Sequence, residues 1–442
     1  MPASIATSSR RSPFTRRTPS AGMPASSGVT SSRRARRNAP SRFGSSVMPS
    51  TVGAGTRPCL ALPHPWLAGV LVRSAGPPDR GRQHSSPSHR TTGATTMTTT
   101  QQRVLVTGGS GFIAGHCVLQ LLDQGYLVRT TVRSLTREDA VRAVLTDAGM
   151  VHGDALSFVA ADLTSDDGWA DAVSGCDFVL HVASPVHIGH VQDEDDVIVP
   201  ARDGALRVLR AARDAGVKRV VLTSAFHAVG FGHPHTDHTF TEDDWSVLDG
   251  PGVDAYGRSK ILAERAAWDF VAAEGGSLEL VTMLPVAVMG PVMGKEISGA
   301  NHLIQRSLDG AMPGYPNVWI PIVDVRDVAS AHILAMTASG AAGQRFLVSS
   351  GPVVALKEIG AILKEHFGDA AKRVPSRSIP NVVVRLASLF GKEFRSIVPD
   401  LDHVKKVSNE KARRVLRWEP RESEDAIVAS AESLIRKSLV KA

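Results

Sequence analysis

The chain has 442 residues, of which 43% are apolar, enough for a large buried core and more than one domain. Its formal net charge is +7, but residues 1–96 hold 14 Arg, no Lys and a single acid, a balance of +13 that leaves about −6 for residues 97–442. The basic charge is therefore confined to residues 1–96. The net charge of the chain is thus no reason to expect nucleic-acid binding by residues 97–442.

Residues 1–96 are rich in Ser, Arg, Pro, Thr and Gly and have little apolar periodicity, so we expect them to be disordered. Three interpretations compete: a transit-like targeting segment, a basic regulatory arm, or translated sequence upstream of the true start. We favour the third, because MTTTQQRVLVTGG from Met97 reads as an ordinary N-terminus just before a strand. The sequence has three cysteines and no apolar run fit to span a bilayer, which favours a cytoplasmic protein.

From Arg103 onward, short apolar runs alternate with stretches of helical periodicity. The expected strands are 103–107, 126–132, 156–163, 177–184, 218–224 and 278–285, and the expected helices include 116–125, 137–149, 195–215 and 253–275. Continuous apolar strands separated by helices predict an α/β fold with a doubly wound parallel sheet, whose ligand site lies at the carboxyl ends of the strands. We assign 102–285 to an NAD(P)-binding Rossmann domain. Residues 286–442 are assigned mainly to a smaller α/β substrate lobe, with some segments returning to the first domain.

The segment VTGGSGFIAG places Gly108, Gly109 and Gly111 after the first strand and before the first helix. Glycines there let backbone N–H groups approach a pyrophosphate, whose charge a helix N-terminus favours. Within a strand, turn, helix and strand unit this turn predicts dinucleotide binding, with Ala114 small enough for the helix to pack on the strand.

The end of the second strand, VRTTVRSLTR, bears on the choice of cofactor. An NAD site usually has a carboxylate there, whereas this segment has no acid and three arginines. A guanidinium can hold a 2′-phosphate with paired hydrogen bonds, so NADPH is preferred over NAD, which stays possible. We choose Arg133 for that contact and expect Arg129 to pair with a neighbour. Asp162 is a candidate for the adenine amino group or, alternatively, a helix cap.

Tyr256 and Lys260 lie four residues apart in AYGRSKILAE, and so share one side of the expected helix. A phenol has an unperturbed pKa near 10. We expect the Lys260 ammonium to lower that pKa and to hold the nicotinamide ribose.

These residues resemble the extended short-chain dehydrogenases/reductases, most closely the branch of dihydroflavonol reductases and cinnamoyl-CoA reductases. The resemblance runs from about Gln102 to the C-terminus and rests on VTGGSGFIAG, GYLVRTTVRS, ADL, HVASPV, YGRSK, LPVAVMGP, DVRDVASAH and SNEKARRVLRWEP. It implies that Tyr256 is the general acid and Lys260 its electrostatic partner. The further cofactor contacts that we expect are Phe112, Ile113, Leu163, Val182, Ala183, Ser184, Thr223, Pro285 and Val288.

One position departs from the family pattern. The family's strand usually ends in Thr-Ser-Ser, and its second Ser hydrogen-bonds the substrate carbonyl, but VLTSAFHAV has Ala225 there. A one-residue offset turns a side chain to the opposite face of a strand. Either the turn is remodelled so that Ser224 or Thr223 reaches the site, or His227 replaces the serine, or the enzyme works without it. We favour remodelling and choose Ser224 as the third catalytic residue; the alternative is that Ser224 only satisfies a nearby backbone group.

The segment HPHTDH (233–238) has metal-binding residue types without the spacing of a structural zinc site, so we predict a solvated loop and no metal. Phe226, Met293 and Tyr315 are candidates for an apolar substrate pocket.

The resulting prediction is an NADPH-dependent reductase of an aldehyde or ketone, acting on a small-molecule carbonyl substrate, with no nucleic acid or membrane partner, as a monomer or homodimer. The alternatives are a nucleotide-sugar epimerase or dehydratase with tightly bound NAD, and a non-catalytic NAD(P)-binding sensor.

Overall fold

The computed structural model describes residues 101–185, 193–391, 395 and 397–441. The interpretation of residues 1–96 lies outside these ranges. In the part described, no helix is both long and apolar enough to cross a membrane.

A seven-stranded sheet forms the centre of the first part of the chain, with the strand order β12-β7-β5-β4-β1-β2-β3. All neighbouring strands in it are parallel. The strands are β1 (Arg103–Val106), β2 (Leu127–Val132), β3 (Leu156–Ala160), β4 (Phe178–His181), β5 (Arg219–Thr223), β7 (Glu279–Pro285) and β12 (Arg345–Val348). The order reverses beside β1, which confirms the predicted doubly wound α/β fold and puts the ligand-binding end at the carboxyl ends of β1 and β4.

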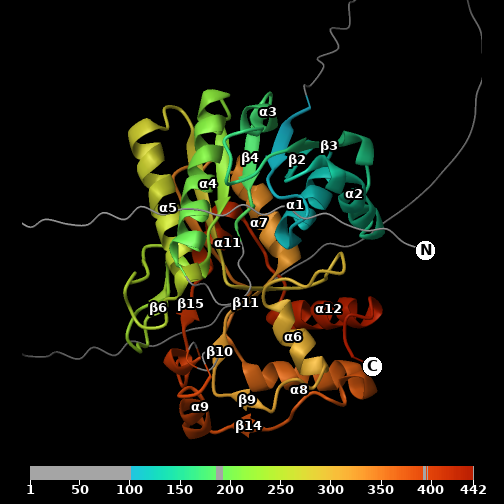
Figure 1. Ribbon diagram of the computed structural model, residues 1–442, viewed down its shortest axis with the longest axis vertical. Coiled ribbons are helices and arrows are strands. Elements are labelled where there is room, and N and C mark those ends of the chain that lie inside the picture. The colour runs from blue at the N-terminus through green and yellow to red at the C-terminus, as the bar shows by residue number, and fades with distance from the viewer. Residues whose placement is uncertain (1–100, 186–192, 392–394, 396, 442) are drawn as a thin grey trace, which may run out of the picture. The chain divides into compact units, whose positions relative to one another are not determined.

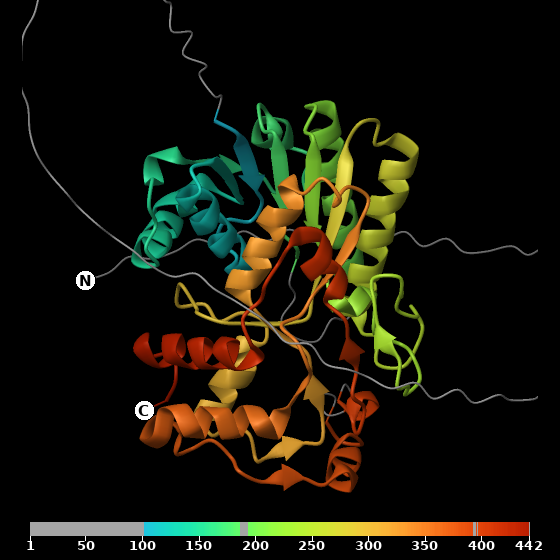
Figure 2. The ribbon, with the colours of Figure 1, turned by 180° about the vertical axis from the view of Figure 1, so that it is seen from behind.

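Helices cover both faces of this sheet (Figures 1 and 2). One face carries α3 (Trp169–Val173), α4 (Asp195–Asp214) and α5 (Ala255–Glu274), and the other carries α1 (Phe112–Asp123), α2 (Glu138–Asp147) and α7 (Val325–Thr337). Because each central strand is buried on both sides, its residues form a continuous apolar run such as VVL in β5. α11 (Glu410–Leu416) packs against α7 and β12, so late segments of the chain return to the sheet.

A smaller lobe follows β7 and has its own apolar core. Its helices are α6 (Asn301–Leu308), α8 (Leu356–Phe367), α9 (Asn381–Ala387) and α12 (Ser423–Arg436). Its strands are short: β8 (Ala287–Met289) pairs with β11 (Ile322–Asp324), β10 (Trp319–Ile320) with β13 (Val354–Ala355), and β9 (Tyr315–Pro316) with β14 (Ser378–Ile379). β8 begins two residues after the end of β7, so the lobe starts at the carboxyl end of the sheet.

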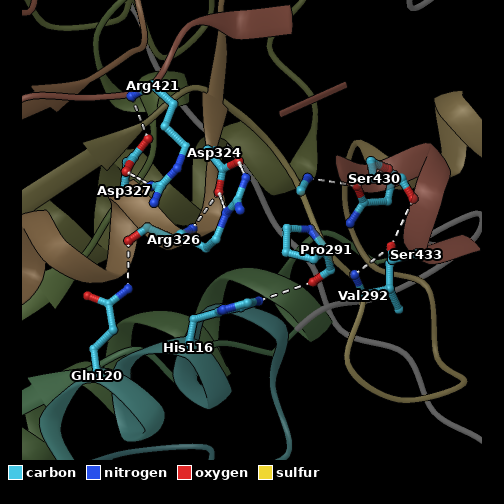
Figure 3. Close-up of polar contacts among 12 residues, drawn as sticks. His116, Gln120, Pro291, Val292, Asp324, Arg326, Asp327, Arg421, Ser430 and Ser433 are labelled. Atoms are coloured by element: carbon cyan, nitrogen blue, oxygen red, sulfur yellow. Dashed lines mark hydrogen bonds and ion pairs between the residues drawn. The ribbon is translucent and has the colours of Figure 1, made fainter. Parts of the chain in front are cut away.

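Hydrogen bonds join α1 to this lobe (Figure 3). Nε2 of His116 lies 3.1 Å from the carbonyl oxygen of Pro291, and the next residue, Val292, donates its N–H to Oγ of Ser433 at 2.8 Å. Burial lowers the pKa of His116 to about 4, so its imidazole is neutral at pH 7 and donates from Nε2 to the carbonyl. The helix that follows the glycine turn is thereby tied to the loop after β8 and to α12.

Candidate active site

The glycine turn between β1 and α1 has a conformation that larger residues would not allow. Gly108 has φ of 75°, and a Cβ there would lie 3.0 Å from Cβ of Ala183. A Cβ on Gly109 would collide with the side chain of Thr130. Gly111 precedes α1 and gives it no side-chain cap, and among the described residues no acceptor binds the N–H groups of Phe112 and Ile113. Two free N–H groups and the positive end of the helix dipole suit an anion.

Thr107 holds the ends of β1 and β4 together. Its Oγ1 accepts the N–H groups of Val182 and Ala183, at 3.0 and 2.9 Å, and lies 2.9 Å from Nδ1 of His181. Burial and the charge of Lys260 lower the pKa of His181 to about 3, so the ring is neutral and can accept the threonine proton. Of the expected cofactor contacts, Ala183 therefore lies against Gly108, and Val182 is bonded to the preceding Thr107.

The arginines at the end of β2 have different surroundings. Nη1 of Arg129 donates to backbone carbonyl oxygens at the end of α3, among them those of Asp171 and Ser174. Its guanidinium thus joins β2 to the end of α3, in line with the expectation that Arg129 pairs with a neighbour. Arg133 is exposed at the carboxyl end of β2, where it can meet a ligand phosphate.

Asp162 follows β3 and closes a local turn. Its Oδ1 accepts the N–H of Thr164 at 2.9 Å and the hydroxyl of the same residue at 2.7 Å. These bonds, and more weakly the charge of Arg133, hold the pKa of Asp162 below its usual value. The neighbouring Leu163 packs against Gly204 of α4. The bonds are those of a two-residue turn and not of a helix cap, since α3 begins at Trp169 with Gly168 before it, and the adenine contact stays a prediction.

Tyr256 and Lys260 lie on the first turns of α5. Asp254 caps this helix, since its Oδ1 accepts the N–H of Gly257 at 2.8 Å. Nζ of Lys260 is 5.7 Å from the centre of the Tyr256 ring and donates to Oγ of Ser184 at 3.1 Å. The structure thus brings Tyr256, Lys260 and Ser184 together at the carboxyl end of β4.

The electrostatics of this pair differ from the sequence expectation. Burial, with a smaller contribution from Asp254, raises the pKa of Tyr256 to about 12, so Lys260 does not make the phenol acidic here. Burial lowers the pKa of Lys260 to about 8, against the opposing charge of Glu264. Desolvation is thus the main cause of the shift for both groups. At pH 7 the phenol is protonated and the amine is mostly charged.

The two hydroxyls at the end of β5 point to opposite faces of the sheet. Oγ1 of Thr223 lies 2.7 Å from Nε2 of His332 on α7, whereas Oγ of Ser224 donates to Oε2 of Glu264 on α5 at 2.7 Å. Ser224 therefore bonds a buried carboxylate, a partner that the sequence did not suggest. Ala225 follows with an extended backbone and is buried.

Glu264 is the centre of a buried polar group that sequence reasoning missed. Besides the Ser224 hydroxyl, its carboxylate accepts hydrogen bonds from Thr282 Oγ1 at 2.8 Å and from Arg345 Nε at 2.8 Å. Its position one turn after Lys260, on the side of α5 that faces the sheet, was the available signal. A cavity of about 20 Å³ is bordered by Ser184, Ser224, Lys260 and Glu264, among others, and Tyr256 does not line it.

His227 lies beside Tyr256. It belongs to the short helix η3 (Phe226–Ala228) that directly follows β5. Its ring stacks on Phe231, with centres 4.2 Å apart and an angle of 12°, and meets the Tyr256 ring edge-on at 5.0 Å.

The remaining predicted site residues lie outside the group formed by Tyr256, Lys260 and their neighbours. Pro285 ends β7 opposite Val348, and Val288 is half-buried in β8. Phe226 and Tyr315 are 4% and 1% exposed and belong to the two apolar cores, so they are packing residues and not the pocket lining we expected. Met293 places its sulfur against Gly115 of α1.

The histidine-rich loop makes contacts of its own. His235 stacks on His403 with ring centres 4.3 Å apart, and Nε2 of His238 bonds Asp244 at 2.9 Å. Across the described residues no group of three or more metal-ligating side chains is arranged to hold a metal ion.

Comparison with known proteins gives consistent matches. The model of the NAD dependent epimerase/dehydratase family matches residues 104–349. Ketoreductase azaE of Aspergillus niger is 34% identical over 301 residues, which cover 63% of this chain and 87% of that protein. Cinnamoyl-CoA reductase 1 of Arabidopsis thaliana is 36% identical over 251 residues, 56% of this chain and 70% of that protein.

Solved structures extend the similarity. The NADPH complex of the yeast methylglyoxal/isovaleraldehyde reductase Gre2 is 25% identical, with a TM-score of 0.63 over 76% of this chain and 99% of that chain. The NADPH complex of Gre2 from Candida albicans is 27% identical, with the same TM-score and coverage.

Proposed function

The chain belongs to the NAD-dependent epimerase/dehydratase family, and from this membership we propose that it is an NADPH-dependent reductase of an aldehyde or ketone. Three of the relatives described above are named as reductases, and the two solved structures are complexes with NADPH. The observation that carries the proposal is the placement of Tyr256 and Lys260 beside Ser184, at the end of the strand next to the glycine turn.

The residues around the glycine turn fit a dinucleotide. Gly108, Gly109 and Gly111 leave the N-terminus of α1 open, and the N–H groups of Phe112 and Ile113 face it without a bonded acceptor among the described residues. We assign the pyrophosphate to this turn. Arg133, exposed at the end of β2 with no acid beside it in the strand, would hold the 2′-phosphate and so favour NADPH.

Bound NADPH supplies the hydride that a carbonyl carbon accepts. Tyr256 is protonated at neutral pH and donates its phenolic proton to the carbonyl oxygen, which becomes the hydroxyl of the product. Lys260, mostly charged at pH 7, stabilises the phenolate that remains. Ser184 accepts a hydrogen bond from Lys260 and so holds the ammonium at the carboxyl end of β4.

Loss of NADPH absorbance with a panel of carbonyl compounds tests the proposal. The panel should include methylglyoxal and isovaleraldehyde, since the name of one relative mentions these two compounds. We expect turnover with at least one of them, and a loss of about 10²- to 10⁴-fold in kcat/KM for Tyr256→Phe with unchanged NADPH affinity. A Tyr256→Phe variant of wild-type activity contradicts the proposal. So does a chain that purifies with bound NAD and does not consume NADPH with any carbonyl of the panel.

A further inference from the structure

We propose that His227 donates a hydrogen bond to the oxygen of the substrate carbonyl, in place of the hydroxyl that the chain lacks at Ala225. The inference rests on the proposed reductase function and adds a catalytic residue to it. It follows from the position of the ring, from the absence of a hydrogen bond between its nitrogens and any described residue, and from the bonds that both neighbouring hydroxyls make to other groups.

Packing fixes the His227 ring on three sides next to the proposed acid. Phe231 stacks on one face at 4.2 Å, and Tyr256 presents its ring edge-on at 5.0 Å. A Cβ on Gly257 would lie 3.8 Å from Cδ2 of His227, so the ring also lies against the backbone of α5. The ring is therefore held close to the Tyr256 side chain without using its nitrogens.

The bonding of its nitrogens distinguishes His227 from the buried histidines. Among the described residues, burial lowers the pKa of five histidines, namely His116, His181, His227, His332 and His403. The other four each have a ring nitrogen in a hydrogen bond to a described residue, and His227 has none. His227 itself is half-buried, so its nitrogens are open to water and, beside the Tyr256 ring, to the oxygen of a ligand.

The neighbouring hydroxyls are engaged on other sides of the strand. Ser224 donates to Glu264 and Thr223 is bonded to His332, both at 2.7 Å. Ala225 has no donor beyond its backbone. Of the side chains from 223 to 227, only His227 combines a hydrogen-bond donor with a place beside Tyr256.

The charge state of His227 suits this role. Burial lowers the pKa of His227 to about 4, although Asp254 and Asp400 oppose that effect, while Lys260 and Lys405 add to it. At pH 7 the ring is neutral, with one N–H to donate and one nitrogen to accept. A neutral imidazole can polarise a carbonyl and keep its proton, which leaves proton transfer to Tyr256.

Three variants separate a donor from a packing residue. His227→Phe keeps a flat ring for Phe231 and Tyr256 but removes the donor, and His227→Gln keeps a donor but loses the ring. Ala225→Ser in the His227→Phe background restores a hydroxyl where the family has one. Each is compared with wild type and Tyr256→Phe for kcat and KM on the fastest carbonyl of the panel, for the Kd of NADPH from fluorescence quenching, and for Tm.

We expect His227→Phe to lower kcat by about 10²- to 10³-fold. The Kd for NADPH and the Tm of this variant should stay close to the wild-type values. We expect His227→Gln to keep at least a tenth of the wild-type kcat. Ala225→Ser in the His227→Phe background should raise kcat at least tenfold above that of His227→Phe alone. If Tyr256→Phe is inactive but His227→Phe keeps a third or more of wild-type kcat, only this inference is overturned. If the loss in His227→Phe comes with an equal loss in NADPH affinity or Tm, the ring is a packing residue and the inference is also overturned. An active Tyr256→Phe overturns the proposed function together with it.

Discussion

Ser224 donates a 2.7 Å hydrogen bond to Oε2 of Glu264, and both side chains are buried. The strand hydroxyl closest to the family's serine is thus part of an internal polar group that also includes Thr282 and Arg345. A carboxylate withdrawn from water needs such donors, because an unpaired charge in the interior is very costly. We therefore give Ser224 a supporting role through Glu264.

Ser224→Ala tests that role directly. Removing one donor from the buried carboxylate should lower the free energy of unfolding by about 1–3 kcal/mol and leave kcat/KM within about tenfold of wild type. Thr282→Val is the matched control, since Thr282 donates to the other oxygen of the same carboxylate at 2.8 Å and lies within β7. Urea unfolding and carbonyl reduction measure the two effects. A drop of 10²-fold or more in kcat with unchanged stability would restore Ser224 as the catalytic serine.

The pKa of Lys260, about 8 in this structure, predicts an alkaline limit to activity. The ammonium is present below that pH and is lost above it, so kcat/KM should fall as the pH rises past about 8. The charge of Glu264 raises the pKa of Lys260, so Glu264→Gln should move this limit to lower pH. Glu274→Gln, at the exposed end of the same helix, is the control and should leave the limit in place. An unchanged profile in Glu264→Gln would mean that another group sets the alkaline limit.

Much of the sheet could be predicted because its strands are buried on both faces. β5, for example, has the apolar run VVL at its centre, and the expected 218–224 exceeds the observed Arg219–Thr223 by one residue at each end. The lobe could not be predicted in the same detail. Strands of two residues, such as β9 and β14, have no periodicity, and their pairing depends on tertiary contacts.

In the candidate site too, features that depend on tertiary contacts could not be predicted from the sequence. The spacing of Tyr256 and Lys260 within one helix predicted their proximity, whereas the opposite orientations of Thr223 and Ser224 were not predicted. The Glu264–Arg345 ion pair joins residues 81 positions apart, a distance that local patterns do not encode. The high pKa of Tyr256 also escaped prediction, because desolvation depends on the packing around a group and not on its neighbours in sequence.

Arg133 should decide between the two nicotinamide cofactors. Arg133→Ala removes charge-assisted hydrogen bonds to a 2′-phosphate, so the KM for NADPH should rise about 10- to 100-fold while the KM for NADH changes little. Arg137→Ala, a few residues further along the chain, is the matched control for the loss of one positive charge. Steady-state kinetics with both cofactors provide the measurement. Equal effects of both substitutions would show a general electrostatic attraction and not a specific phosphate contact.

His332 should make the fold sensitive to acid. It is fully buried between Thr223 and the carbonyl oxygen of Val328, and burial lowers its pKa from 6.5 to about 4. As the pH falls below 6.5, His332 is protonated in the unfolded chain but stays neutral in the folded protein until about pH 4. The free energy of unfolding therefore decreases between these two pH values, by up to about 3 kcal/mol from this residue. His332→Leu should be less stable than wild type at pH 7, because Thr223 loses its partner, but should lose less stability between pH 6.5 and 4.5. Urea unfolding at several pH values measures this difference, with His302→Gln on the exposed side of α6 as the control. If His332→Leu and wild type lose the same free energy of unfolding over that range, the folded ring takes up its proton near its ordinary pKa, and acid sensitivity comes from other groups.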